Sequence, residues 1–137
     1  MKQSANLALN NHAVAPSEQA GAALRTFFRI ATAWRLSHAN AETLLGVSHP
    51  TYMRWRANPN NARLGPNTLE RLSYLFGIYK TLQVLLPDPE AADQWVHRPN
   101  SALLFQGQTP MQRMLGGQVA DLYQVRRHLD AARGLWS

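Results

Sequence analysis

Apolar residues recur at every third or fourth position in two long segments, which is the spacing of amphipathic α-helices. The first segment follows Pro16 and ends near Ser37, and its apolar positions are Leu24, Phe27, Phe28, Ala31 and Trp34. The second begins at Pro66, and its apolar positions are Leu69, Leu72, Leu75, Phe76, Tyr79, Leu82, Leu85 and Leu86. Pro87-Asp88-Pro89 ends it, since prolines cannot continue a helix. We expect both stripes to lie in the core of an all-α fold.

Residues 41–56, AETLLGVSHPTYMRWR, predict two short helices joined by a tight turn. Gly46 ends the first helix, because glycine readily adopts the left-handed conformation found after a helix. Ser48 is expected to cap the second helix, with Pro50 in its first turn, where a missing N–H costs nothing. The apolar residues that hold the two helices together are Leu44, Leu45, Val47, Tyr52 and Trp55. The pattern is that of a helix-turn-helix.

Packing on the apolar side of this motif leaves polar residues free to contact DNA, and we expect them to be Ser48, His49, Thr51, Arg54 and Arg56. A helix that carries short polar side chains and arginine near its N-terminus can enter the major groove. The following loop, residues 57–65, is able to follow a DNA backbone, with Arg63 as its only charge. An ordinary helical hairpin, or a helix-turn-helix that has lost DNA binding, would show a similar pattern.

The C-terminal third predicts short helices and one longer one. Residues 90–96 form the first, with Trp95 as its apolar anchor, and Arg98-Pro99-Asn100 forms an extended corner. Thr109 caps the next short helix. The last helix begins near Val119, and we expect it to end at Gly134.

The net charge of +6 is unevenly distributed. Residues 1–80 hold nine Lys or Arg and three acidic residues, whereas residues 81–137 hold five of each. The positive excess therefore belongs to the half that contains the helix-turn-helix, as a phosphate-facing surface requires. A charge excess that only keeps the protein in solution is the alternative explanation.

Several classes of site are not predicted. The chain has no cysteine, which excludes disulfides and thiolate sites and is compatible with a reducing cytoplasm. No apolar run reaches the roughly 20 residues of a membrane span, and residues 1–14 make a poor secretion signal. The five histidines are scattered, and there is no GxGxxG, P-loop lysine or GxSxG motif. We expect a cytoplasmic protein with no catalytic residue, metal or cofactor.

Short motifs follow one another in a definite order. In the N-terminal half they are WRLS (34–37), LLGVS (44–48), RWR (54–56) and LERL (69–72). In the C-terminal third they are Trp95, RPN (98–100), LFQG (104–107), TPM (109–111), GG (116–117) and LDAARG (129–134). The second group resembles the toxin-binding domain of the MbcA/ParS/Xre antitoxin family, and the first is similar to the Xre-type helix-turn-helix upstream of it. Together they cover roughly residues 20 to 136.

The resemblance implies the antitoxin of a type II toxin–antitoxin pair. An Xre/Cro-like helix-turn-helix half (residues 16–86) would follow a flexible tail (1–15) and join, through a long helix, a small toxin-binding domain (87–137). The implied partners are a RES-domain toxin that destroys NAD and the operator DNA of the operon encoding both proteins. We expect a homodimer, since operators usually have two half-sites. The toxin-binding residues that we expect are Trp95, Arg98, Asn100, Arg126, Arg133, Leu135 and Trp136.

In that family the antitoxin's C-terminal end reaches into or over the toxin's active site. Arg133 would pair with an anionic group there, and Trp136 would fill an apolar slot. Without a partner, Arg133 would complement the helix dipole and residues 98–100 would be a turn. Ala131-Ala132 and Gly134-Leu135-Trp136 depart from the family's usual residues.

Two other functions fit the same residues. One is a free-standing repressor whose C-terminal third only dimerises it. The other is a protein-binding module whose helix-turn-helix no longer contacts DNA.

Overall fold

The computed structural model describes the backbone of residues 17–136 and the side chains of residues 17–134. This part of the chain consists of helices and connecting loops, without a strand. The helices are α2 (Ser17–Ala33), α3 (His38–Leu45), α4 (His49–Ala57), the 3-10 turn η1 (Pro59–Asn61), α5 (Pro66–Leu85), α6 (Pro89–Gln94), the 3-10 turn η2 (Trp95–His97), α7 (Pro110–Met114) and α8 (Val119–Trp136). The all-α prediction is confirmed, and the predicted tail of residues 1–15 lies outside the described residues.

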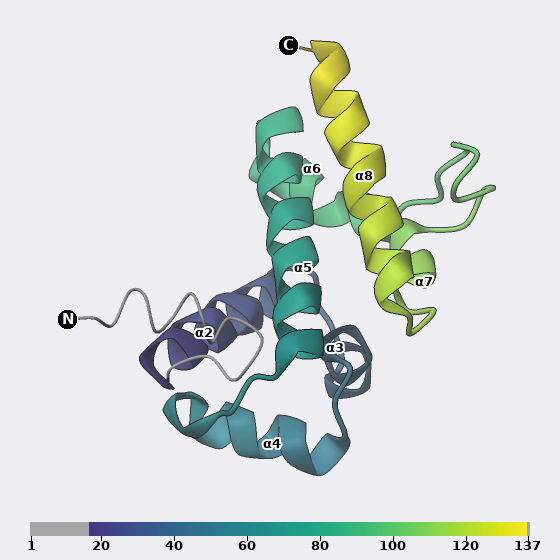
Figure 1. The fold of residues 1–137 in the computed structure, drawn as a ribbon. Coiled ribbons are helices and arrows are strands. Elements are labelled where there is room, and N and C mark those ends of the chain that lie inside the picture. Colours follow the sequence, from purple (N-terminus) through teal and green to yellow (C-terminus); the bar gives the residue numbers. More distant parts are fainter. Residues whose placement is uncertain (1–16, 137) are drawn as a thin grey trace.

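Helix α5 is the central element, as Figure 1 shows. Helices α2 and α3 pack against α5, α4 lies beyond its N-terminal end, and α8 runs beside it in the same direction. Helix α4 lies at one end of the molecule, and the C-terminal end of α8 lies at the other (Figure 1). The two predicted functional regions are therefore separated along the axis of α5.

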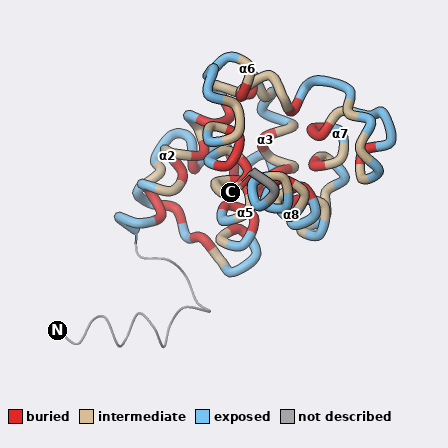
Figure 2. The backbone as a smooth tube through the Cα atoms, turned by 90° about the horizontal axis from the view of Figure 1, so that it is seen from above, coloured by how far each residue is buried: buried red, intermediate tan, exposed pale blue. Residues whose placement is uncertain are grey.

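One continuous hydrophobic core joins the N-terminal and C-terminal helices, and its buried residues lie on the inner faces of the helices (Figure 2). The stripe predicted on α2 is buried as expected, with Leu24, Phe27 and Trp34 at 0% exposure. Helix α2 nevertheless ends at Ala33, earlier than predicted. Arg35 adopts a left-handed conformation with φ of 55°, and Ser37 serves as the N-cap of α3.

The C-terminal third differs from the prediction in two places. Helix α6 ends at Gln94, and Trp95 begins the 3-10 turn η2. The expected end of the last helix at Gly134 is wrong, because α8 continues through this residue to Trp136. A glycine inside a helix costs only about 1 kcal/mol, so it permits a helix end without imposing one. The predicted cap at Thr109 is confirmed, and Gln112 completes a capping box.

The side chain of Arg71 on α5 is buried where the two halves of the molecule meet, with 8% exposure. Its Nη1 donates to the carbonyl oxygens of Thr43 (3.2 Å) and Leu44 (3.5 Å) at the end of α3. Its Nη2 donates to the carbonyl oxygen of Gly117 (2.9 Å), between α7 and α8, and its Nε donates to Asn67 Oδ1 (2.9 Å). One guanidinium thus connects α3, α5 and the turn before α8.

We expect Arg71→Met to lower the free energy of unfolding by about 3 kcal/mol, because it removes charge-assisted hydrogen bonds and leaves buried carbonyls without donors. The corresponding fall in Tm is about 10 °C. Urea and thermal unfolding would measure it, with Arg29→Ala as the control. Arg29 is an exposed arginine on α2, where such a change costs about 0.5 kcal/mol or less. Equal stability of the two variants would contradict the role of Arg71.

Candidate functional site

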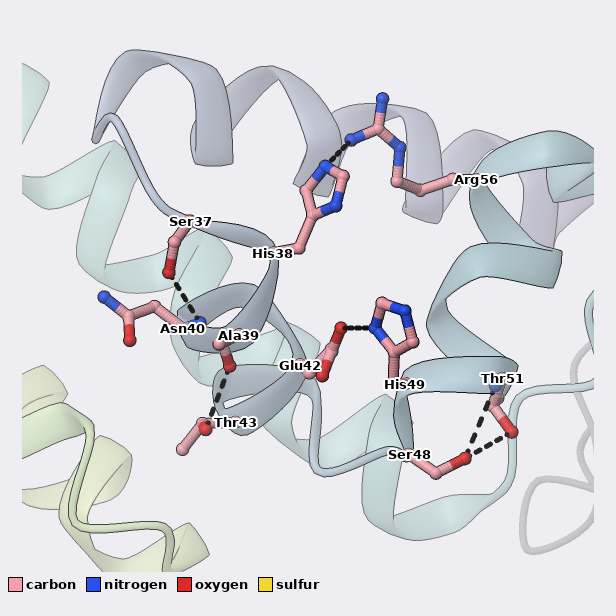
Figure 3. Close-up of polar contacts among 10 residues, drawn as sticks. All are labelled: Ser37, His38, Ala39, Asn40, Glu42, Thr43, Ser48, His49, Thr51 and Arg56. Carbon is pink, nitrogen blue, oxygen red and sulfur yellow. Dashed lines mark hydrogen bonds and ion pairs between the residues drawn. The ribbon is translucent and has the colours of Figure 1, made fainter.

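The turn between α3 and α4 is built from the residues that the sequence predicts (Figure 3). Gly46 has φ of 71°, and its N–H donates to the carbonyl oxygens of Glu42 and Thr43. Ser48 caps α4, since its Oγ accepts from the N–H of Thr51 at 3.4 Å and also donates to Thr51 Oγ1 at 3.1 Å. The helix-turn-helix is therefore confirmed, and the Ser48 hydroxyl is used in the cap.

Helix α4 presents two polar flanks, because successive side chains are rotated by about 100°. Buried Tyr52 and Trp55 define its inner side. His49 and Arg56, seven residues apart, share the flank that faces α3 (Figure 3). Thr51 and Arg54 lie on the opposite flank, where Arg54 Nη2 donates to Thr51 Oγ1 at 3.4 Å.

Met53 lies between the two flanks, opposite the buried side of α4. It is 38% exposed. An apolar side chain in this position is able to contact a thymine methyl group in the major groove. Met53 was not among the predicted DNA-binding residues, which were all polar.

The flank that faces α3 is held by contacts within the protein. His49 Nδ1 lies 2.5 Å from Glu42 Oε2, so a carboxylate of α3 sits beside this flank. Arg56 Nη1 donates to His38 Nε2 at 2.6 Å, and its guanidinium carbon lies 6.0 Å from the centre of the Phe28 ring. His49 and Arg56 are exposed but already paired, whereas the Thr51 flank carries no such carboxylate contact among the described residues.

Beside the Thr51 flank, α4 and the following loop line an open hollow of about 490 Å³. Its lining contains arginine and amide side chains and no acidic residue; the lining residues are Thr51, Arg54, Trp55, Ala57, Asn58, Asn61 and Arg63. Arg25 of α2 approaches the same loop and donates from Nη1 to Asn60 Oδ1 at 3.0 Å. Guanidinium and amide donors around an acid-free hollow match the oxygens of a phosphate backbone.

In the C-terminal half, three rings pack where η2 meets α8. Trp95 stacks on His128 with 6.3 Å between ring centroids, and Phe105 meets both rings edge-on at 5.8 and 5.1 Å. Phe105 is buried, with 2% exposure, and Trp95 is half-buried. Burial lowers the pKa of His128 from its ordinary value of 6.5. Trp95, predicted as a toxin contact, thus has a packing role in the free protein.

The segment between η2 and α7 projects from the side of the molecule (Figure 1). Asn100 closes its base: its N–H donates to the carbonyl oxygen of Gln108 (3.0 Å), and its carbonyl oxygen accepts from the N–H of Gly107 (2.8 Å). The Asn100 side-chain oxygen also accepts from the N–H of Ala102 at 2.9 Å. Asn100 therefore shapes this loop, and Leu103, which the sequence did not single out, is 86% exposed on it.

Of the remaining predicted toxin-binding residues, Arg98 follows η2, whereas Arg126, Arg133, Leu135 and Trp136 belong to α8. Arg98 is exposed after η2 and donates to Gln94 Oε1 at 2.8 Å. Arg126 lies against α5, where its Nη1 donates to the Ser73 carbonyl oxygen at 3.3 Å, and its Nε pairs with Asp130 at 3.3 Å. Arg133 is exposed on α8. The side chains of Leu135 and Trp136 lie outside the described residues.

Residues 17–134 hold no cluster of three or more His, Asp or Glu side chains placed to bind a metal ion. Within the described part of the chain, every helix is too short or too polar to cross a membrane.

Two family models match consecutive parts of the chain. Residues 13–77 match the antitoxin Xre-like helix-turn-helix domain, and residues 81–134 match the antitoxin Xre/MbcA/ParS C-terminal toxin-binding domain. The chain is also similar to the uncharacterized protein y4oB of Sinorhizobium fredii (strain NBRC 101917 / NGR234). The two are 41% identical over 119 residues, which span 86% of this chain and 89% of that protein. The resemblance seen in the sequence is confirmed for both halves.

We expect the folded protein to lose stability as the pH falls below 6.5, since burial among Trp95 and Phe105 favours neutral His128. The contribution of neutral His128 to the free energy of unfolding is fully present above pH 6.5 and is lost as the pH falls towards the lowered pKa. Comparing wild type with His128→Leu at pH 7.5 and 5.5 would isolate it from the other histidines. An NMR titration midpoint for His128 at or above 6.5 would contradict this expectation.

Proposed function

This chain belongs to the Xre/MbcA/ParS family of antitoxins, and on that premise we propose that it inhibits a RES-domain toxin and represses its own operon. The toxin would degrade NAD, and the C-terminal region of this chain would cover the toxin's active site. The helix-turn-helix would bind the operator as part of a homodimer. The observation that carries the proposal is a basic helix-turn-helix at one end of α5 and a neutral toxin-binding domain packed along α5, with the C-terminal end of α8 pointing away from α4.

DNA binding is supported by the shape and charge of α4. Its N-terminal end is free of acidic residues in the first turn, as a helix entering the major groove requires. Thr51, Met53 and Arg54 would meet base edges, while Arg63 and the loop amides would contact phosphates. His49 and Arg56 would contact DNA on the other flank, after exchanging their partners Glu42 and His38 for phosphate oxygens.

Toxin inhibition is supported by the position of the C-terminal end of α8. This end points away from α4, so a toxin bound there would not cover the DNA-reading helix (Figure 1). Arg133 is exposed near this end, and Leu135 and Trp136 continue the same helix. Because arginine and tryptophan are frequent interface anchors, we propose these three residues as the group that enters the toxin. Arg98 and half-buried Trp95 would extend the contact along the domain.

We expect Arg54→Ala to weaken operator binding about 10-fold or more, since an arginine contact to a base edge is lost. The measurement is a titration of a labelled duplex that covers the promoter upstream of this gene. Arg127→Ala is the matched control, because it removes the same charge from an exposed position on α8. Its distance from α4 should leave binding within about twofold, since salt screens remote charges. If Arg54→Ala binds like wild type, α4 is not the reading helix.

We expect this protein to form a stable complex with the product of the adjacent reading frame when the two are co-expressed. We also expect it to restore the cellular NAD that this product alone would deplete. Deleting Gly134 to Ser137 should keep operator binding and impair this protection, because the last residues of α8 are removed. Co-purification and an NAD assay in the same cells measure both effects. Full protection by the shortened protein would exclude the tail as the inhibitory group. A wild type that forms no complex and leaves NAD unchanged would favour the stand-alone repressor.

A further inference from the structure

Leu103 differs from the other exposed apolar side chains of the described residues. It is 86% exposed, compared with 51% for Val84, 43% for Tyr123 and 38% for Met53. The others lie on helices, where neighbouring side chains cover part of their surface. Leu103 stands on the projecting loop between η2 and α7, which we call the 100–109 loop.

The 100–109 loop is held in one conformation by its own backbone. The N–H groups of Phe105 and Gln106 both donate to the Ala102 carbonyl oxygen at 2.9 Å, which closes a tight turn around Leu103. Gln106 and Gly107 then adopt left-handed conformations, with φ of 51° and 89°. Together with the pairing of Asn100 to Gly107 and Gln108, these bonds fix both sides of the loop. Little chain entropy remains to be lost if Leu103 is buried by a partner.

The loop is also fixed relative to α8. Phe105, two residues after Leu103, is buried and packs edge-on against the stacked rings of Trp95 and His128. His128 belongs to α8, the helix whose end we propose to enter the toxin. The loop therefore holds Leu103 at a fixed position relative to α8. Such a position suits an apolar anchor that enters a preformed pocket on a partner.

We propose that Leu103 is an apolar anchor that enters a pocket on the toxin, at a second contact separate from the end of α8. This inference rests on the proposed function. The 100–109 loop lies inside the region that matches the toxin-binding domain, residues 81–134, and that part of the chain carries no excess charge that would favour nucleic acid.

A second copy of this chain is a less suitable partner for Leu103 than the toxin is. A stable dimer needs about 800 Å² of matching surface on each partner. Leu103 stands alone on a projection, and the residues near it, Ser101, Gln106 and Gln108, are exposed and polar. A symmetric dimer brings the same patch of two copies together, so Leu103 would need an apolar hollow within its own patch, where the neighbouring residues are polar.

The test compares Leu103→Ala and Leu103→Asp with wild type and with Val84→Ala. The full-length proteins are titrated against the purified product of the adjacent reading frame, and NAD protection is measured in cells. We expect Kd to rise about 10-fold for Leu103→Ala and about 100-fold for Leu103→Asp, with Val84→Ala within about twofold of wild type. Because Leu103 is 86% exposed, its variants should unfold at the temperature of the wild type.

The outcomes separate this inference from the proposed function. If wild type binds and both Leu103 variants bind within about twofold of it, the anchor role is overturned while the antitoxin function stands. If the variants change only self-association, measured by sedimentation, Leu103 serves a second copy and the inference is overturned. A wild type that does not bind at all overturns both. Loss of affinity at Leu103 with intact operator binding supports the anchor.

Discussion

The buried guanidinium of Arg71 is the constraint on which the arrangement of the two halves depends. A charge removed from water must be satisfied, and here its acceptors are backbone carbonyls at the end of α3 and in the turn before α8, together with the amide of Asn67. Gly46 is required beside it, because a Cβ there would lie 2.6 Å from Arg71 Nε and because φ is 71°. Gly46, which ends α3, therefore also makes room for Arg71, the side chain that fixes the orientation of α3.

This constraint makes α5 a shared element rather than a linker. The two family matches meet inside it, between residues 77 and 81. Its first half holds α3 through Arg71, and α8 packs along it. Arg126 of α8 crosses Gly77 so closely that a Cβ there would lie 2.1 Å from its Nη1. Because α8 packs on α5 and Arg71 bonds α5 to α3, a toxin that binds α8 would also be held in a fixed orientation relative to α3.

Local signals in the sequence located the main helices, although they missed the ends of α2, α6 and α8, and they did not predict the contacts between helices. Gly46, Ser48, Pro66 and Thr109 mark helix ends through their own backbone preferences, and the structure has them at those ends. Arg71 was counted as one positive charge among nine, because the Thr43 and Gly117 carbonyls that accept from it lie 28 and 46 residues away in the sequence. For the same reason the sequence did not predict that Arg56 pairs with His38, which lies 18 residues away. The sequence did not single out Leu103, since its exposure depends on how the 100–109 loop closes.

These contacts reduce the number of basic residues that are available to bind phosphates. Arg71 is buried and Arg56 is paired with His38 over Phe28, so neither is free to meet a phosphate without losing a partner. The other basic residues around α4 are few for one DNA-binding unit. They are Arg25, Arg35, Arg54 and Arg63, and two of them already donate hydrogen bonds, Arg25 to Asn60 and Arg54 to Thr51. Each phosphate contact adds to an affinity that falls steeply with salt, so a single copy with so few contacts would bind weakly at physiological ionic strength. Two copies on adjacent half-sites would double the contacts, which is the physical reason to expect operator binding by a dimer or by a toxin-joined assembly.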